Sequence, residues 1–101
     1  MEVSGAHYLH LDYKSKCTNL HGHNWIITVT VQSEEVDHNG MVVDFSKIKE
    51  IVNRFDHALI NDVMGDINPT AENMAKWLCD RIPHCVRVSV QETEGNVATY
   101  E

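Results

Sequence analysis

Two segments of the chain alternate apolar and polar residues, and this alternation constrains the fold most. In "WIITVTVQS" (25–33) and in "VRVSVQET" (86–93), every second residue is apolar. A period of two predicts half-buried antiparallel strands, with one face on a core and the other in water. The face expected to be buried carries Trp25, Ile27, Val29, Val31, Val86, Val88 and Val90. The opposite face carries Thr28, Thr30, Arg87, Ser89 and Gln91, so it needs no second layer of helices.

A turn and a helix are predicted after the first of these strands. "DHNGM" (37–41) contains Asn-Gly, a strong hairpin signal, and "MVV" (41–43) is expected to form a short strand after it. Asp44 or Ser46 can cap the helix that follows, and Asp44 is interpreted as a cap rather than as a site residue. The apolar positions of this helix have the spacing of one helical stripe: Phe45, Ile48, Ile51, Val52 and Phe55.

A second helix and a last pair of strands complete the pattern. "DINPT" (66–70) is a helix start signal, and Pro83 is expected to end the helix. The apolar face of this helix carries Met74, Ala75, Leu78 and Ile82. "VATY" (97–100) is predicted to be the last strand. The order predicts one α+β domain over 1–101, with two helices on one face of an antiparallel four-stranded sheet.

The net charge of −7 limits the classes of partner. A nucleic-acid or anionic-membrane binder has a basic face, which this composition argues against. No apolar run approaches the roughly 18 residues of a membrane helix, and the first residues lack the layout of a signal peptide. The odd count of three cysteines argues against a disulfide framework. We therefore expect a cytoplasmic protein.

A His-x-His pair, His21 and His23, lies in the stretch "CTNLHGHNW" (17–25). On an extended backbone, residues two apart project from the same side, so both imidazoles can reach one metal ion. His7, in "AHYLHL" (6–11), is the best third ligand because that segment can form a neighbouring strand. The result would be a three-histidine site with an open position, of the catalytic type. The alternative is that these histidines are ordinary polar residues.

Other metal folds that use such a pair fit the sequence poorly. A cupin requires a glutamate four or five positions after the pair, where this chain has Ile27 and Thr28. A metal-dependent amidohydrolase requires a barrel of about 250 residues. Cys79 and Cys85 lack the Cys-x-x-Cys spacing of a zinc finger and are interpreted as structural residues. His10, His38 and His84 are interpreted as surface residues.

Seven motifs follow one another in a fixed order along the chain. They are "AH" (6–7), "KC" (16–17), "LHGHNW" (20–25), "GMVVDF" (40–45), "DHALIN" (56–61), "PTAEN" (69–73) and "ET" (92–93). Together they resemble the family of 6-pyruvoyl-tetrahydropterin synthase and 6-carboxy-5,6,7,8-tetrahydropterin synthase, from His7 to Tyr100. The resemblance implies a tunnelling fold, whose subunits close their sheets into a barrel with active sites at subunit interfaces. A homo-oligomer is therefore expected, either a hexamer built as a dimer of trimers or a tetramer.

The resemblance also implies a role for individual residues. His7, His21 and His23 would bind Zn²⁺. Cys17 would be the catalytic acid or base, with His57 polarised by Asp56 as its partner. Glu92 would anchor the pterin ring, and Thr70 would lie near it.

These assignments can be weighed against simpler interpretations. Cys17 could simply be a small buried side chain, and Asp56 and His57 could only end a helix. Glu92 could be a solvated charge, and Thr70 could only cap a helix. The chemistry agrees with the assigned roles, because a thiol acts as a base when a nearby cation stabilises its thiolate. A carboxylate can also grip the donor-rich edge of a pterin with two hydrogen bonds. Lys16, with Lys14, is the nearest basic residue to contact a triphosphate.

The predicted activity is that of a zinc-dependent lyase of the 6-carboxytetrahydropterin type. It would convert 7,8-dihydroneopterin triphosphate to 6-carboxy-5,6,7,8-tetrahydropterin, with release of acetaldehyde and triphosphate, in queuosine (7-deazaguanine) synthesis. Two alternatives stay open. One is 6-pyruvoyl-tetrahydropterin synthase, which eliminates triphosphate only, and the other is a non-catalytic homologue that binds a pterin or a metal.

Overall fold

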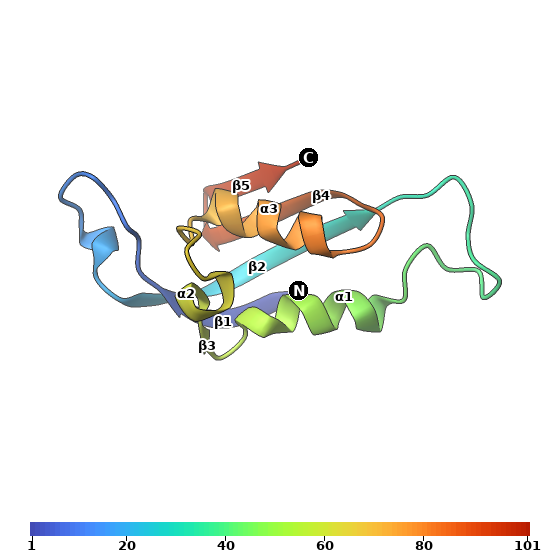
Figure 1. The fold of residues 1–101 in the computed structure, drawn as a ribbon, viewed down its shortest axis with the longest axis horizontal. Coiled ribbons are helices and arrows are strands. Elements are labelled where there is room, and N and C mark those ends of the chain that lie inside the picture. Colours follow the sequence, from blue (N-terminus) through green and yellow to red (C-terminus); the bar gives the residue numbers. More distant parts are fainter.

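The computed structural model describes residues 1–101 and consists of one sheet with helices on one face (Figure 1). The strands are β1 (Glu2–His7), β2 (His21–Val31), β3 (Ala58–Leu59), β4 (Cys85–Thr93) and β5 (Asn96–Tyr100). They lie in the order β3-β1-β2-β4-β5, and all pairs are antiparallel except β1 with β3, which is parallel. The α+β class is confirmed. The predicted four-stranded antiparallel sheet is wrong, because the sheet has five strands and is mixed.

Two strand predictions are wrong. "MVV" (41–43) forms no strand, and both backbone polar groups of Met41 bond Asp37 within the turn instead of a neighbouring strand. The Asp37 N–H donates to the Met41 carbonyl (2.9 Å), and the Met41 N–H donates to the Asp37 carboxylate (3.0 Å). The sequence predicts the first strand over 6–11, but β1 spans Glu2–His7. β3 has only two residues, too few to show an alternation.

The helical segments are η1 (Lys16–Thr18), α1 (Phe45–Val52), η2 (Asn53–Phe55), α2 (Ile60–Met64) and α3 (Ala71–Arg81). Both predicted caps are present. The Asp44 carboxylate accepts the Ser46 N–H (2.9 Å) at the start of α1, and the Thr70 hydroxyl accepts the Asn73 N–H (3.1 Å) at the start of α3. α3 ends before Pro83, as predicted, whereas η2 and α2 were not predicted separately.

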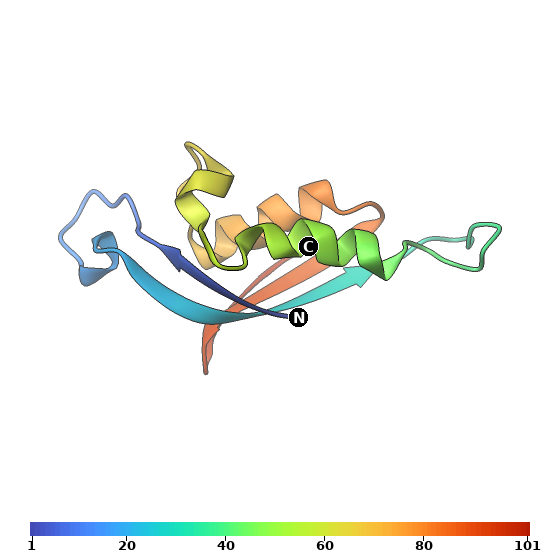
Figure 2. The ribbon, with the colours of Figure 1, turned by 90° about the horizontal axis from the view of Figure 1, so that it is seen from below.

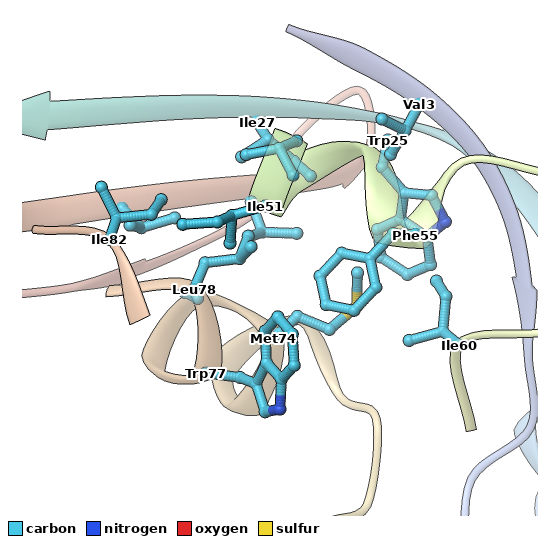
Figure 3. Packing of buried hydrophobic residues seen from close by; sticks show 14 of the residues in the cluster. Val3, Trp25, Ile27, Ile51, Phe55, Ile60, Met74, Trp77, Leu78 and Ile82 are labelled. Carbon is cyan, nitrogen blue, oxygen red and sulfur yellow. The ribbon is translucent and has the colours of Figure 1, made fainter. Parts of the chain in front are cut away.

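The core lies between the sheet and the helices (Figure 3). Trp25 and Ile27 of β2 are fully buried, and Phe55 packs against Trp77 with 5.2 Å between the ring centroids. Figure 2 shows the helices on one side of the curved sheet, with no helix over the other side. Thr28 and Thr30 point to that open face and are exposed, as the alternation predicts.

A bulge in β4 corrects one prediction about the buried face. Thr30 pairs with Arg87 and Val31 with Cys85, so Val86 is an extra residue in the ladder. Val86 is 41% exposed, whereas Val88 and Val90 are buried. The prediction that Val86 shares the buried face is therefore wrong, because the bulge interrupts the alternation.

Candidate active site

Three histidine side chains meet where β1 ends and β2 begins. His7 and His21 are direct partners in the β1–β2 ladder, and His23 lies two residues further on the same face of β2. The ring centroids are 4.5 Å apart for His7 and His21, and 5.0 Å apart for His21 and His23. The structure therefore brings together the three histidines that the sequence predicted as neighbours.

Glu92, near the end of β4, is the fourth member of this cluster. Its Oε1 lies 3.4 Å from Nε2 of His7 and 3.3 Å from Nε2 of His23. Gln91 pairs with Val97 and Thr93 with Asn96, so Glu92 is an extra residue at a second irregularity of β4. Irregular ladder positions of this kind re-aim side chains at functional sites. Glu92 also lines a pocket of about 280 Å³ together with Glu72 of α3 and residues 95–98.

Hydrogen bonds to backbone carbonyls fix two of the imidazole rings. Nδ1 of His7 lies 2.7 Å from the Pro69 carbonyl oxygen, and Nδ1 of His21 lies 2.7 Å from the Asn19 carbonyl oxygen. Because a carbonyl oxygen only accepts, each Nδ1 carries a proton, and in the neutral imidazole Nε2 then keeps a free lone pair. This arrangement, with Nδ1–H on a carbonyl, is the one commonly found for metal-binding histidines.

The free nitrogens fit a metal ion. Nε2 of His7 and Nε2 of His23 are buried and have no hydrogen-bond partner, which is uncommon for polar atoms in a folded protein. Burial lowers the pKa of His7, although the Pro69 carbonyl and the Glu92 carboxylate act in the opposite direction. A neutral imidazole is the form that binds metal. The ligand atoms of the three histidines and Glu92 all lie within 4.8 Å of one another, so the group can hold a metal such as zinc.

Cys17 lies in η1, four residues before His21, and is half-buried. Its N–H donates to the Ser15 hydroxyl (3.1 Å), and its carbonyl accepts the Leu9 N–H (2.9 Å). The bond from Leu9 ties the Cys17 backbone to the segment that follows His7. The side chain of Lys16 beside it is exposed.

Asp56 and His57 lie at the edge of the sheet, just before β3. Asp56 Oδ1 accepts the Ser4 N–H (2.9 Å), and its Oδ2 lies 3.1 Å from Nδ1 of His57. The Ser4 hydrogen bond is the main cause that lowers the pKa of Asp56, so the carboxylate stays ionised beside the imidazole. His57 is 84% exposed and has a left-handed backbone (φ 53°). Its ring lines an open pocket of about 580 Å³, whose lining includes His23.

Within one chain, six of the nine predicted site residues form two groups. The first is the cluster of His7, His21, His23 and Glu92, and the second is the pair Asp56 and His57. No hydrogen bond or ion pair joins the second group to Cys17 or to the cluster. Thr70 caps α3, next to the carbonyl that holds His7, and Lys16 extends into solvent.

The remaining histidines and cysteines agree with their predicted places. His10, His38 and His84 are exposed. Cys79 and Cys85 are partly buried against the core. Burial, with a contribution from Cys85, raises the pKa of Cys79 to about 12, so this thiol stays protonated. None of the helices combines the length and the apolar character that a membrane-spanning segment needs.

Sequence reasoning missed two residues that support the cluster. Pro69 was interpreted only as a helix start, and its carbonyl oxygen, which holds His7, carries no sequence signal. Asn61 is buried and bonds the Tyr8 backbone through both polar atoms of its side chain. Its place in the motif "DHALIN" was the only available indication.

Comparison with known proteins gives concordant matches. The profile of the family described as "6-pyruvoyl tetrahydropterin synthase" matches residues 1–101. A 6-carboxy-5,6,7,8-tetrahydropterin synthase from Bacillus subtilis (strain 168) is 32% identical, over 99% of this chain and 80% of the relative. A protein of the same name from Synechocystis is 33% identical, over 87% of this chain and 79% of the relative. The solved structure of Caenorhabditis elegans 6-pyruvoyl tetrahydropterin synthase matches with a TM-score of 0.76 and 27% identity, covering 100% of this chain and 90% of that one.

Proposed function

Since the chain belongs to the 6-pyruvoyl tetrahydropterin synthase family, we propose that it acts as a 6-carboxy-5,6,7,8-tetrahydropterin synthase. The substrate would be 7,8-dihydroneopterin triphosphate, and the products the carboxypterin, acetaldehyde and triphosphate. The cluster of three histidines, with two buried Nε2 atoms that make no hydrogen bond, is the observation that carries this proposal. The names of the Bacillus subtilis and Synechocystis relatives support the carboxy branch.

His7, His21 and His23 would hold a Zn²⁺ ion through their Nε2 atoms. When bound, the ion supplies a Lewis acid that stabilises negative charge on side-chain oxygens of the substrate. Burial favours the neutral form of His7, and the Pro69 carbonyl orients its ring, so this imidazole is ready to bind the metal without losing a proton. The other divalent ions that accept imidazole ligands are also candidates in principle, and metal analysis identifies the one in use.

Cys17 and the pair Asp56–His57 would handle the protons of the reaction. We propose that the Cys17 thiol removes a proton from the side chain of the pterin. Asp56 stays ionised, and its Oδ2 lies 3.1 Å from Nδ1 of His57, so it can orient this imidazole to accept and return a proton. The two groups make no contact within one chain, which is consistent with an interface site in which a second subunit supplies one of them.

Glu92, Thr70 and Lys16 would bind the substrate. The Glu92 carboxylate lines a polar pocket beside the histidines, which supports a role in gripping the donor-rich edge of the pterin. Thr70 stands at the start of α3, whose first residues line the same pocket. The exposed ammonium of Lys16, with that of Lys14, would contact the triphosphate.

We propose a homo-oligomer, as a hexamer or a tetramer, with the open polar face of the sheet lining a barrel. Thr28 and Thr30 on that face would then meet solvent inside the barrel. The reaction would belong to queuosine (7-deazaguanine) synthesis in the cytoplasm.

The decisive experiment incubates the purified protein with dihydroneopterin triphosphate and identifies the products. Acetaldehyde in an amount equal to the triphosphate released supports the proposal. Release of triphosphate with a pyruvoyl product and no acetaldehyde supports the second candidate, 6-pyruvoyl-tetrahydropterin synthase, which the name of the C. elegans structure favours.

A matched pair of variants tests whether the chain is an enzyme at all. Cys17→Ala is expected to lose turnover and to retain its zinc, whereas Cys85→Ala, far along the chain and outside the cluster, is expected to keep both. Turnover by Cys17→Ala at the wild-type rate contradicts the role of the thiol. A wild-type protein that binds zinc and a pterin without any turnover is instead a non-catalytic homologue.

A further inference from the structure

Between Ser4 and His10, the backbone N–H and carbonyl groups of alternate residues face β3 and the segments on either side of it. β3 pairs with this edge only at Gly5 and Ala6. Toward the start of β1, the Asp56 carboxylate accepts the Ser4 N–H, and the His57 N–H donates to the Ser4 carbonyl. Beyond His7 the chain after β3 turns away into α2, so no strand is left to pair with Tyr8 and His10.

Asn61 replaces the missing strand at Tyr8. Its Oδ1 accepts the Tyr8 N–H (3.0 Å), and its Nδ2 donates to the Tyr8 carbonyl (2.9 Å). The side chain thus makes the pair of bonds that a backbone residue makes in an antiparallel ladder. Asn61 is 8% exposed, so this pair of bonds is shielded from water.

Asn68 repeats the arrangement at His10, two residues further along. Its Oδ1 accepts the His10 N–H (2.9 Å), and its Nδ2 donates to the His10 carbonyl (3.0 Å). Its own carbonyl accepts Nδ2 of Asn73 (2.9 Å), which links Asn68 to the first turn of α3. Four hydrogen bonds from two side chains therefore hold the backbone that leaves β1.

The opposite edge of this segment leads to Cys17. The Leu9 N–H donates to the Cys17 carbonyl (2.9 Å), as expected for the residue between Tyr8 and His10 in an extended chain. His7 precedes the segment, and its Nδ1 donates to the carbonyl of Pro69, the residue after Asn68. The same stretch of backbone thus connects the first histidine of the cluster with the cysteine.

We infer that Asn61 and Asn68 are positioning residues: their side chains act as a surrogate strand that fixes the metal ligand His7 and, through Leu9, the cysteine Cys17. The inference rests on the proposed function for the metal and for Cys17. Only an amide suits both positions, because each must donate one hydrogen bond and accept another. An aspartate of the same shape accepts from the N–H, but its ionised oxygens repel the carbonyl.

The test compares Asn61→Asp and Asn68→Asp with Asn53→Asp, a control whose side chain makes no hydrogen bond in the structure. Zinc affinity of the metal-free protein is measured by competition with a chromophoric chelator. We expect a loss of about tenfold or more in both Asn61→Asp and Asn68→Asp, the range seen when a residue that orients a metal ligand is removed. The alkylation rate of Cys17, mapped by peptide mass spectrometry against Cys85, is expected to rise.

Activity assays add a readout that general destabilisation does not produce. Neither asparagine is proposed to touch the substrate, so kcat should fall while KM stays near the wild-type value. Circular dichroism first establishes that each variant is folded. If Asn61→Asp does not fold, Asn68→Asp decides the question alone. The side chain of Asn68 is less buried than that of Asn61, so a charge is tolerated better there.

The outcomes separate this inference from the proposed function. A folded Asn68→Asp with wild-type zinc affinity and wild-type Cys17 alkylation overturns the inference, as does a wild-type protein that binds no zinc. The wild-type protein could instead turn over no pterin while Asn61→Asp and Asn68→Asp lose zinc affinity. That result removes the proposed reaction and leaves the positioning role supported.

Discussion

Replacing Gly5 by alanine should destabilise the sheet beside the histidine cluster. A Cβ at this position would lie 2.6 Å from the carbonyl oxygen of Phe55 and 3.1 Å from Cδ1 of Ile60. Phe55 and Ile60 are fully buried, and the closer contact is with backbone, so no side-chain rotation relieves it. Ordinary contacts begin near 3.4 Å, so β1 and η2 must separate by several tenths of an ångström.

The expected cost follows from the groups that this separation disturbs. Overpacking of a tight core costs about 1–3 kcal/mol. The Gly5 carbonyl also accepts the buried Nε1–H of Trp25 (3.0 Å), a bond whose weakening adds about 1 kcal/mol. The alanine recovers about 0.5–1 kcal/mol, because it restricts the unfolded chain more than glycine does. The net loss in the free energy of unfolding is therefore about 2 kcal/mol, which lowers Tm by about 8–16 °C.

Gly22→Ala provides a matched control on the neighbouring strand. Its Cβ would meet the Gly5 carbonyl oxygen at 3.6 Å, an ordinary contact, so we expect a change within about 0.5 kcal/mol. Urea and thermal unfolding are compared at one protein concentration, because assembly changes the apparent stability. Gly5 pairs with His23 and lies two residues before His7, so zinc affinity should fall as well. Equal stability of Gly5→Ala and Gly22→Ala would refute the reasoning.

Three further predictions concern the cluster and the helix beside it. His21→Ala should abolish stoichiometric zinc binding, measured by elemental analysis, while the exposed His10→Ala retains it; zinc retained by His21→Ala contradicts the assignment. Burial lowers the pKa of His7 in the folded chain, so below about pH 6.5 the unfolded chain binds a proton that the folded chain does not. The stability of the metal-free protein should therefore fall as the pH drops below about 6.5. His7→Asn should flatten this dependence in urea titrations, and an unchanged slope speaks against it. Thr70→Ala should cost about 1 kcal/mol through loss of the α3 cap, and Thr70→Ser should restore most of it; equal losses in both variants point to a role other than capping.

The sequence by itself predicted the features that depend on local periodicity. The alternation in β2 placed Trp25 and Ile27 in the core and Thr28 and Thr30 on the open face, because side chains of a strand alternate between its faces. The same rule placed His21 and His23 on one side. Capping chemistry located the starts of α1 and α3, since it too depends on neighbours a few residues apart.

Only the tertiary structure decided which distant groups complete the site. The hydrogen bond that orients His7 comes from Pro69, and the bonds that hold Tyr8 come from Asn61, each more than fifty residues away along the chain. The bulge at Val86 and the irregularity at Glu92 are likewise set by pairing with neighbouring strands. Such contacts depend on register and packing between elements, and a periodic pattern within one element does not contain that information. The sequence therefore determined which side chains share a face, and the fold determined what holds them in place.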